Sequence, residues 1–253
     1  MLLSGSAEEL SGWRDQIETY LKDNLLLELK KRHIPQPVTN GINFLGYIIR
    51  KDYLLVRRRV VDNMRLKLRQ YGSLLVKEDE FYRRYSFDEE VLDKLRATLA
   101  SYLGHFKMAN THKLRESIWK RYFFLSQYFD FDVKTRKLVC KYKYPVGIRK
   151  TYRQYLFYRW RFKGDVVLFQ VGRFFEFYST RDEKIAGILG LTKMKKNKRG
   201  ARYGFPVTAL NKYLHKIRCL KRSVTVISER DRYFYEIKER VPVCRFEYKG
   251  SGG

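Results

Sequence analysis

The sequence predicts an α+β protein in two parts, a part of short strands and helices followed by a smaller mixed α/β part. Apolar residues recur at helical spacing in several stretches of the first half. In the second half a strand, two helices and a strand follow one another, which is typical of an α/β unit. Hydrophobic residues make up 44% of the 253-residue chain and aromatic residues 16%, so a packed core can form.

The first part is predicted to begin with a helix over residues 6–23. Ser6 is a plausible N-cap, and Glu9 lies in the capping-box position three residues later. Short strands are expected at three apolar stretches, namely 25–29, 42–49 and 53–56. The last two of these strands form a hairpin. Helices are then predicted at 57–70, 87–103 and 111–128.

Residues 134–163 are strongly basic and rich in tyrosine, and we expect them to form a linker at the domain boundary. The tyrosines of this segment suit either base stacking with phosphate contact or packing of the linker itself. Beyond it, strands are predicted at 166–171, 174–178 and 224–228, helices at 182–189 and 207–220, and a basic loop at 194–203.

The charge of the chain indicates a polyanionic partner. Lys and Arg total 54 against 27 Asp and Glu, which gives a formal net charge of +27. Such an excess destabilises a compact state unless a polyanion neutralises it, and nucleic acid, either DNA or RNA, is the commonest one. Ribosome-like basic proteins and binders of anionic membranes are alternatives that share this charge.

Other features of the sequence bear on its location and on metals. No apolar run approaches the roughly 20 residues that span a bilayer, and acidic residues follow the N-terminus too soon for a signal peptide. The three cysteines form no Cys-x-x-Cys pair, so the sequence predicts neither a metal site nor a disulfide scaffold. We therefore expect a cytoplasmic protein with no membrane partner.

A first basic and aromatic constellation lies in the predicted hairpin. Residues 41–47 read Gly-Ile-Asn-Phe-Leu-Gly-Tyr, and the consecutive Arg57, Arg58 and Arg59 follow closely. An internal glycine lets a duplex backbone approach, and arginines at a helix start would place guanidinium groups near phosphate oxygens. From the residues alone, an ordinary hairpin and a solvated basic helix is an equal alternative.

The block from residue 2 to about 129 resembles the region that follows the catalytic aspartates in bacterial reverse transcriptases. The types most similar are those of group II introns and diversity-generating retroelements. In that family a Phe-Leu-Gly hairpin forms the primer grip of the palm, and a helical thumb follows. The resemblance implies that Phe44, Leu45 and Gly46 contact the primer. It also implies two domains, a palm remnant at 1–56 and a helical thumb at 57–133.

The chain departs from this family at its catalytic centre. No Tyr-x-Asp-Asp motif occurs, and two-metal phosphoryl transfer requires clustered carboxylates. We therefore expect no catalytic residues and no activity of the chain alone. It would be the non-catalytic C-terminal portion of an RNA-directed DNA polymerase. A separate polypeptide would supply the palm, and Mg²⁺ would act as a cofactor only in the complete polymerase.

A second constellation lies in the predicted strand at 174–178. Phe174 and Glu176 are two residues apart, so both side chains point to one face of the strand. An exposed ring stacks on an unstacked base, and a carboxylate beside it can accept a hydrogen bond from a base edge. A buried strand whose phenylalanines belong to the core is the alternative, and the residues alone favour that alternative.

Residues 164 to about 230 resemble the N-terminal mismatch-recognition domain of MutS proteins, including its Phe-x-Glu wedge. The resemblance continues through Ile188–Lys193, Gly204–Pro206 and Ala209–Leu214. It implies that the ring stacks on a mispaired base while the carboxylate bonds to that base. We expect the domain to cover 164–250 and, together with the basic residues of its turn and loop, to contact nucleic acid through Gly172, Arg173, Phe174, Glu176, Lys193, Lys195, Lys196, Lys198 and Arg199.

This second resemblance is also incomplete. Arg173 occupies a position that is usually acidic in the family, which favours phosphate attraction over discrimination. No Walker-type sequence is present, so repair signalling is not expected. Together the two resemblances predict a protein that binds primer–template duplex and mismatched DNA. Two rivals stay open, an interaction module that anchors RNA or protein and an inactive remnant of a reverse transcriptase.

Overall fold

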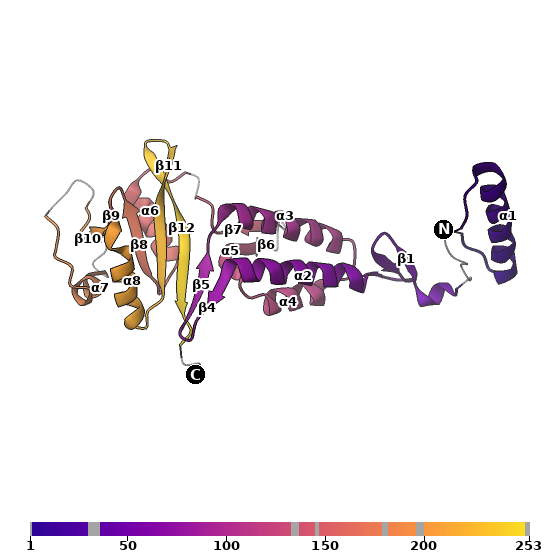
Figure 1. Ribbon diagram of the computed structural model, residues 1–253, viewed down its shortest axis with the longest axis horizontal. Coiled ribbons are helices and arrows are strands. Elements are labelled where there is room, and N and C mark those ends of the chain that lie inside the picture. The colour runs from indigo at the N-terminus through magenta and orange to yellow at the C-terminus, as the bar shows by residue number, and fades with distance from the viewer. Residues whose placement is uncertain are drawn as a thin grey trace. The chain divides into compact units, whose positions relative to one another are not determined.

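The computed structural model describes most of the chain, namely residues 2–29, 36–132, 137–144, 147–178, 182–195 and 200–250. Figure 1 shows a mixed α+β fold, as the sequence predicts. The chain divides into two compact units, which are described separately. The first unit comprises residues 1–61 with 106–111, and the second comprises 62–105 with 112–253.

Helix α1 (Ala7–Leu25) opens the first unit close to its predicted bounds. Ser6 caps it as predicted, because its Oγ accepts a hydrogen bond from the Glu9 N–H at 3.3 Å. The strand predicted at 25–29 is wrong. Its first residue still belongs to the helix, and Leu26 then adopts a left-handed conformation with φ 53°, which ends the helix.

The rest of the first unit is a short 3-10 helix, η1 (Val38–Asn40), and a small antiparallel sheet in the order β1-β2-β3. Its strands are β1 (Ile42–Phe44), β2 (Tyr47–Ile49) and β3 (Leu54–Val56). The single strand predicted at 42–49 is wrong. Leu45 and Gly46 have φ values of 44° and 89°, and positive φ at both positions makes a type I′ turn that reverses the chain. The hairpin of β2 with β3 is confirmed.

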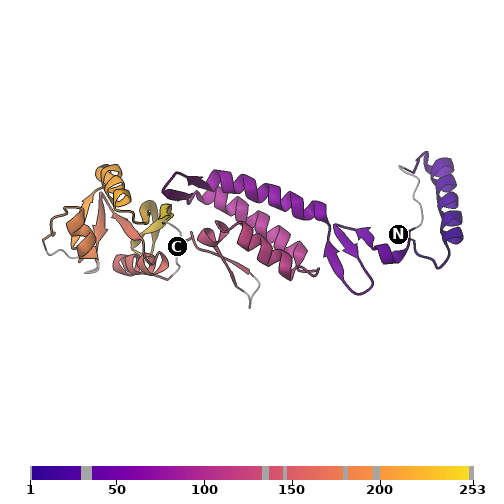
Figure 2. The same cartoon turned by 90° about the horizontal axis from the view of Figure 1, so that it is seen from below.

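The helical part of the chain follows this sheet. Its helices are α2 (Arg58–Leu75), α3 (Glu89–Phe106), α4 (His112–Arg121) and α5 (Leu125–Tyr128), which lie side by side in Figure 2. The single helix predicted at 111–128 is therefore interrupted between α4 and α5. Apolar stripes at helical spacing are buried, with Met64 and Leu68 on α2 and Leu92, Leu95 and Leu99 on α3.

The second unit is built on a seven-stranded sheet in the order β10-β9-β8-β11-β12-β5-β4. The strands are β4 (Val76–Glu78), β5 (Tyr82–Ser86), β8 (Val166–Val171), β9 (Phe174–Phe177), β10 (Tyr203–Pro206), β11 (Val224–Phe234) and β12 (Ile237–Tyr248). Strands β8 and β11 run parallel, and the other neighbours are antiparallel. The strands predicted at 166–171 and 174–178 are thus confirmed.

Strands β4, β5 and β12 were not predicted. The first two come from the range assigned to a helical thumb, so the sheet draws on both predicted parts of the chain. Strand β12 contains Pro242, which normally argues against a strand. The proline fits because Ile227 pairs with Pro242 whereas Val226 pairs with Cys244, so that Val243 is the extra residue of a β-bulge.

The prediction of a linker at 134–163 is wrong. The described residues of this range contain strand β7 (Lys137–Cys140), which pairs with β6 (Phe129–Asp132), and helix α6 (Thr151–Arg161). Helix α6 packs on the sheet through fully buried rings. The centroids of Tyr155 and Tyr158 lie 5.7 and 6.3 Å from that of Phe169 on β8.

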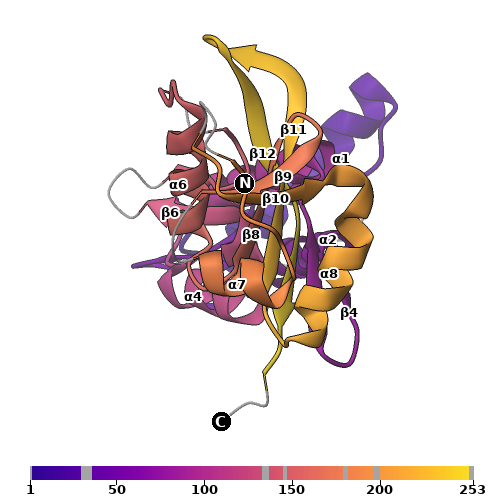
Figure 3. The ribbon, with the colours of Figure 1, turned by 90° about the vertical axis from the view of Figure 1, so that its left-hand side faces the viewer.

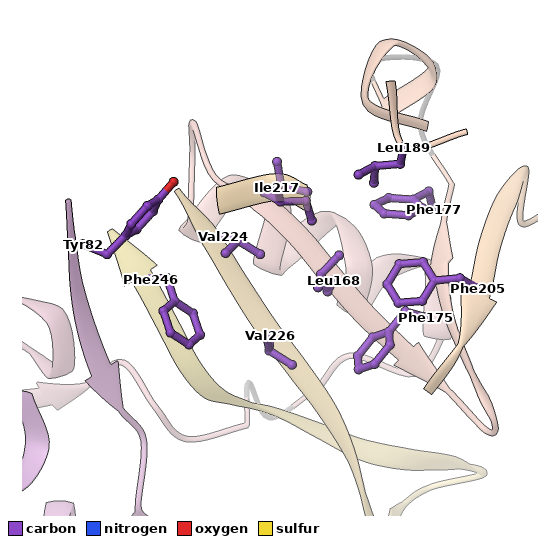
Figure 4. Close-up of a cluster of buried hydrophobic side chains, with 11 residues drawn as sticks. Tyr82, Leu168, Phe175, Phe177, Leu189, Phe205, Ile217, Val224, Val226 and Phe246 are labelled. Atoms are coloured by element: carbon purple, nitrogen blue, oxygen red, sulfur yellow. The ribbon is translucent and has the colours of Figure 1, made fainter. Parts of the chain in front are cut away.

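The other face of the sheet holds a cluster of buried apolar side chains. Helices α7 (Glu183–Ile188) and α8 (Leu210–Cys219), both predicted, cover it, with the 3-10 turn η3 (Val207–Ala209) before α8. In Figure 3, α6 and α8 lie on opposite sides of the strands. The core side chains shown in Figure 4 are Tyr82, Val166, Leu168, Phe175, Phe177, Leu189, Phe205, Ile217, Val224, Val226 and Phe246.

Candidate nucleic-acid interface

The β8–β9 hairpin carries an exposed phenylalanine next to its turn. Val171 pairs with Phe174, so Gly172 and Arg173 form a two-residue turn, and Gly172 has a φ of 59° that favours glycine. Both turn residues are exposed, and the Phe174 side chain is 41% exposed. An exposed ring beside a cation suits insertion between bases, because the ring replaces stacking and the cation attracts phosphate.

Glu176 lies on the same face of β9 as Phe174, but its carboxylate is buried, with 1% exposure. The Tyr178 hydroxyl donates a hydrogen bond to its Oε2. Its cross-strand partner is Phe169, whose ring packs against Tyr155 of α6. In this arrangement the carboxylate does not reach the surface on which Phe174 lies, because α6 and the tyrosines around it cover that part of the strand.

A buried ion pair holds the turn. The Glu229 Oε2 on β11 accepts a hydrogen bond from the Gly172 N–H at 3.0 Å. The same oxygen pairs with the guanidinium of Arg240 on β12, and the two side chains are only 11% and 5% exposed. Arg240 also donates from Nε to the carbonyl of Gln170 at 2.7 Å. The buried pair therefore binds the backbone of both Gln170 and Gly172. These hydrogen bonds fix the position of Phe174 next to the turn.

The basic loop after α7 is only partly described. Lys193 and Lys195 are exposed, whereas Lys196, Lys198 and Arg199 lie outside the described residues. The Met194 N–H donates to the Arg202 carbonyl at 2.7 Å, so the two ends of the loop lie together. Lys193 and Lys195 therefore lie on one loop, which leads from α7 into β10.

The first unit contains the other predicted contact residues. At the β1–β2 turn, the Phe44 and Leu45 side chains are 49% and 76% exposed. The Gly46 carbonyl accepts a hydrogen bond from the Arg57 N–H at 2.8 Å, which joins the turn to the start of α2. Arg57 is half-buried. The two arginines that follow it, Arg58 and Arg59, are exposed.

Sequence reasoning missed the outer side of α6. The tyrosines expected to stack or pack in this region mostly pack, because Tyr142, Tyr144, Tyr155 and Tyr158 are buried. Trp160, which drew no attention in the sequence, is 73% exposed. A helical interpretation of 151–161 would have separated the two groups, since Arg153, Phe157 and Trp160 recur at helical spacing away from the buried tyrosines.

A comparison with known families bears on this unit. Residues 150–238 match the family model of MutS domain I. The chain therefore contains a MutS domain I-like region, and MutS domain I is a DNA-binding, mismatch-recognition domain. The match begins before the expected 164 and includes α6. The search of curated proteins gave no match. The reverse-transcriptase resemblance of residues 2–129 lies outside the matched segment and stays a prediction.

No described helix combines the length and the apolar character that a membrane crossing requires. Among the described residues, no group of three or more His, Cys, Asp and Glu side chains is placed to hold a metal ion.

Proposed function

We propose that this chain binds nucleic-acid duplexes with a mispaired or otherwise distorted step, and that Phe174 is the wedge that enters the step. The observation that carries the proposal is the exposed Phe174 ring at an anchored hairpin turn within the segment that matches MutS domain I. Insertion of a ring unstacks neighbouring bases, which costs a few kcal/mol and costs least where pairing is already defective.

Exposed cations of this unit provide the sequence-independent part of the binding. Arg173 is in the wedge turn itself, whereas the exposed Lys193 and Lys195 lie on the loop that enters β10 opposite Phe177, at the other end of β9 from Phe174. Each phosphate contact releases counterions, so the affinity falls with salt. The formal net charge of +27 favours this contribution. In this proposal Glu176 supports the strand beneath the wedge, and a direct bond to a base would require the side chains that cover it to move, because Glu176 is buried.

The test is equilibrium binding of the whole chain to a matched duplex, a single-mismatch duplex, an RNA–DNA hybrid and single strands at several salt concentrations. Phe174→Ala should remove the preference for the mismatch and leave the salt dependence unchanged. Phe81→Ala is the matched control, because Phe81 is a 52% exposed phenylalanine at another turn of the same unit. Equal affinity of the wild type for matched and mismatched duplexes would rule the proposal out.

A second candidate function is the grip on a primer–template duplex, as the non-catalytic C-terminal portion of an RNA-directed DNA polymerase. Its support is the exposed Phe44 and Leu45 at a turn that a backbone hydrogen bond joins to Arg57. A separate polypeptide would then supply the catalytic palm and its Mg²⁺. Leu45→Asp should weaken hybrid binding by charge repulsion while leaving the mismatch preference intact. No effect on hybrid binding would contradict this role.

A further inference from the structure

The outer side of α6 contains a hollow that the proposed wedge does not use. It has a volume of about 600 Å³ and is lined by the helix and by the residues that lead into it. The lining residues are Gly147, Ile148, Arg149, Lys150, Arg153, Leu156, Phe157 and Trp160. The hollow therefore combines cations with aromatic rings, and its described lining contains no carboxylate.

The cations of the hollow lack acidic partners among the described residues. Arg149, Lys150 and Arg153 form no ion pair within the described parts of the chain, although the Arg149 guanidinium stacks 4.5 Å from the centroid of Tyr235. Like charges that line one hollow repel one another unless an anion lies between them. Arg and Lys side chains in such a group are typical contacts for phosphate oxygens.

The aromatic part of the hollow is open to solvent. The Trp160 side chain is 73% exposed although it is the largest apolar ring system that a protein can bury. Phe157 lies one helical turn before it, and the Arg161 guanidinium stands 5.9 Å from the Phe157 centroid. An exposed indole in a concave setting offers a flat face of the size of a nucleobase, and every base has a π-face that can stack there.

A neighbouring hollow on the far side of Trp160 has a different character. It has a volume of about 530 Å³, and carboxylates of Asp130 and Glu247 are part of its lining. Two of its four cations are already partnered, since Lys141 pairs with Asp130 at 2.5 Å and Arg245 with Glu247 at 2.8 Å. Phosphate should therefore lie on the Arg153 side of the indole, because no described carboxylate lines that hollow.

From these observations we propose that the outer face of α6 binds single-stranded nucleic acid, with one unpaired base stacked on Trp160 and the adjoining phosphates held by Arg149, Lys150 and Arg153. A duplex does not fit this chemistry, because its bases are stacked inside the helix and are not available to the indole. An acidic peptide would satisfy the cations but would leave the exposed indole without a planar partner. The proposal is independent of the wedge, because Phe174 lies on β9 and not in the hollow.

The test uses the fluorescence of Trp160 in the full chain. The chain has three tryptophans, so Trp13→Phe together with Trp119→Phe leaves Trp160 as the reporter. Stacking should quench it when an oligothymidylate or oligouridylate of about 12 nucleotides is added. An abasic oligonucleotide of equal length has the same phosphates and no bases, so it should not quench. The two nucleotide arms distinguish DNA from RNA as the source of the strand.

Substitutions then separate stacking from charge. Trp160→Ala should weaken single-strand binding by about 5- to 150-fold, the range of one lost base stack. Arg153→Ala should reduce the slope of log affinity against log salt by about 0.7, the value of one lost phosphate contact on a single strand. Phe81→Ala is the control for loss of an exposed ring and should leave single-strand binding unchanged.

The proposal fails if Trp160→Ala binds single strands as tightly as the wild type while its thermal midpoint is unchanged. It also fails if the abasic oligonucleotide quenches Trp160 as strongly as the oligothymidylate, because the response would then be one of charge alone. Loss of the mismatch preference in Phe174→Ala has no bearing on either result, so failure of this proposal and failure of the wedge proposal are distinguishable.

Discussion

Replacing Arg240 by methionine removes the cation that holds Glu229 beneath the wedge turn. The two side chains are 5% and 11% exposed, so water cannot fully solvate the carboxylate that is left behind. Removing one partner of a buried ion pair costs about 3–5 kcal/mol. Lys238 Nζ, 3.5 Å from Glu229 Oε1, still compensates part of the charge, which places the expected loss near about 3 kcal/mol.

The assay is urea denaturation of the whole chain followed by circular dichroism. Arg232→Met is the matched control, because Arg232 is an exposed arginine on the neighbouring strand and should change stability by less than about 0.5 kcal/mol. Adding Glu229→Gln to Arg240→Met removes the orphaned charge and should recover about 1 kcal/mol or more. A loss below about 1 kcal/mol in the single variant, or no recovery in the double variant, would refute the assignment of the pair as a buried anchor.

Three further predictions concern the core, the pH dependence and the N-terminal helix. Leu168→Ala, at a fully buried position of β8, should destabilise the second unit by about 2–5 kcal/mol in the same urea assay, and a smaller loss would mean that the core collapses around it. Burial raises the pKa of Tyr85 to about 12. Above about pH 10 the unfolded chain releases this proton while the folded chain keeps it, so Tyr85 alone should lower stability by up to about 1.4 kcal/mol per pH unit until about pH 12. Burial also raises the pKa of Tyr128, Tyr142, Tyr155 and Tyr158, which add to the decline. Tyr85→Phe should lessen the slope of the urea midpoints against pH by its own share, and an unchanged slope would contradict the burial. Ser6→Ala should cost α1 about 1 kcal/mol, seen as faster hydrogen exchange in its first turn with no shift in the midpoint of the second unit.

The elements that the sequence predicts well are those whose pattern is local. Strand β8 is apolar at every residue but Gln170, because a central strand is covered on both faces, by α6 and by α8. Helix α8 and the N-cap of α1 follow from short-range periodicity and capping chemistry. Such patterns require no knowledge of distant partners.

The missed elements depend on partners far away in the chain. Strand β12 alternates charges and holds a proline, and it becomes a strand because β11 and β5 supply its hydrogen bonds on both sides. Helix α6 has aromatic residues on its buried face and on its exposed face, so its sequence shows no clear apolar stripe. Its buried face is defined by the packing of Tyr155 and Tyr158 on Phe169.

The same reasoning explains the candidate site. The resemblance to the Phe-x-Glu wedge and the alternation of a strand predict that Phe174 and Glu176 share a face. The burial of Glu176 follows from α6, whose range the sequence predicts as a linker. The anchoring of the turn by Glu229 and Arg240 is also non-local, since it joins three strands of the sheet.

The central claim is that Phe174 enters a mispaired step, and the most direct measurement places the fluorescent base 2-aminopurine beside a single mismatch. Stacking within the duplex quenches this base, and a wedge that opens the step relieves the quenching. The account predicts a rise in fluorescence when the wild-type chain binds the mismatched duplex, and no rise with the matched duplex or with Phe174→Ala. A rise of equal size with Phe174→Ala, at saturating protein, would contradict it.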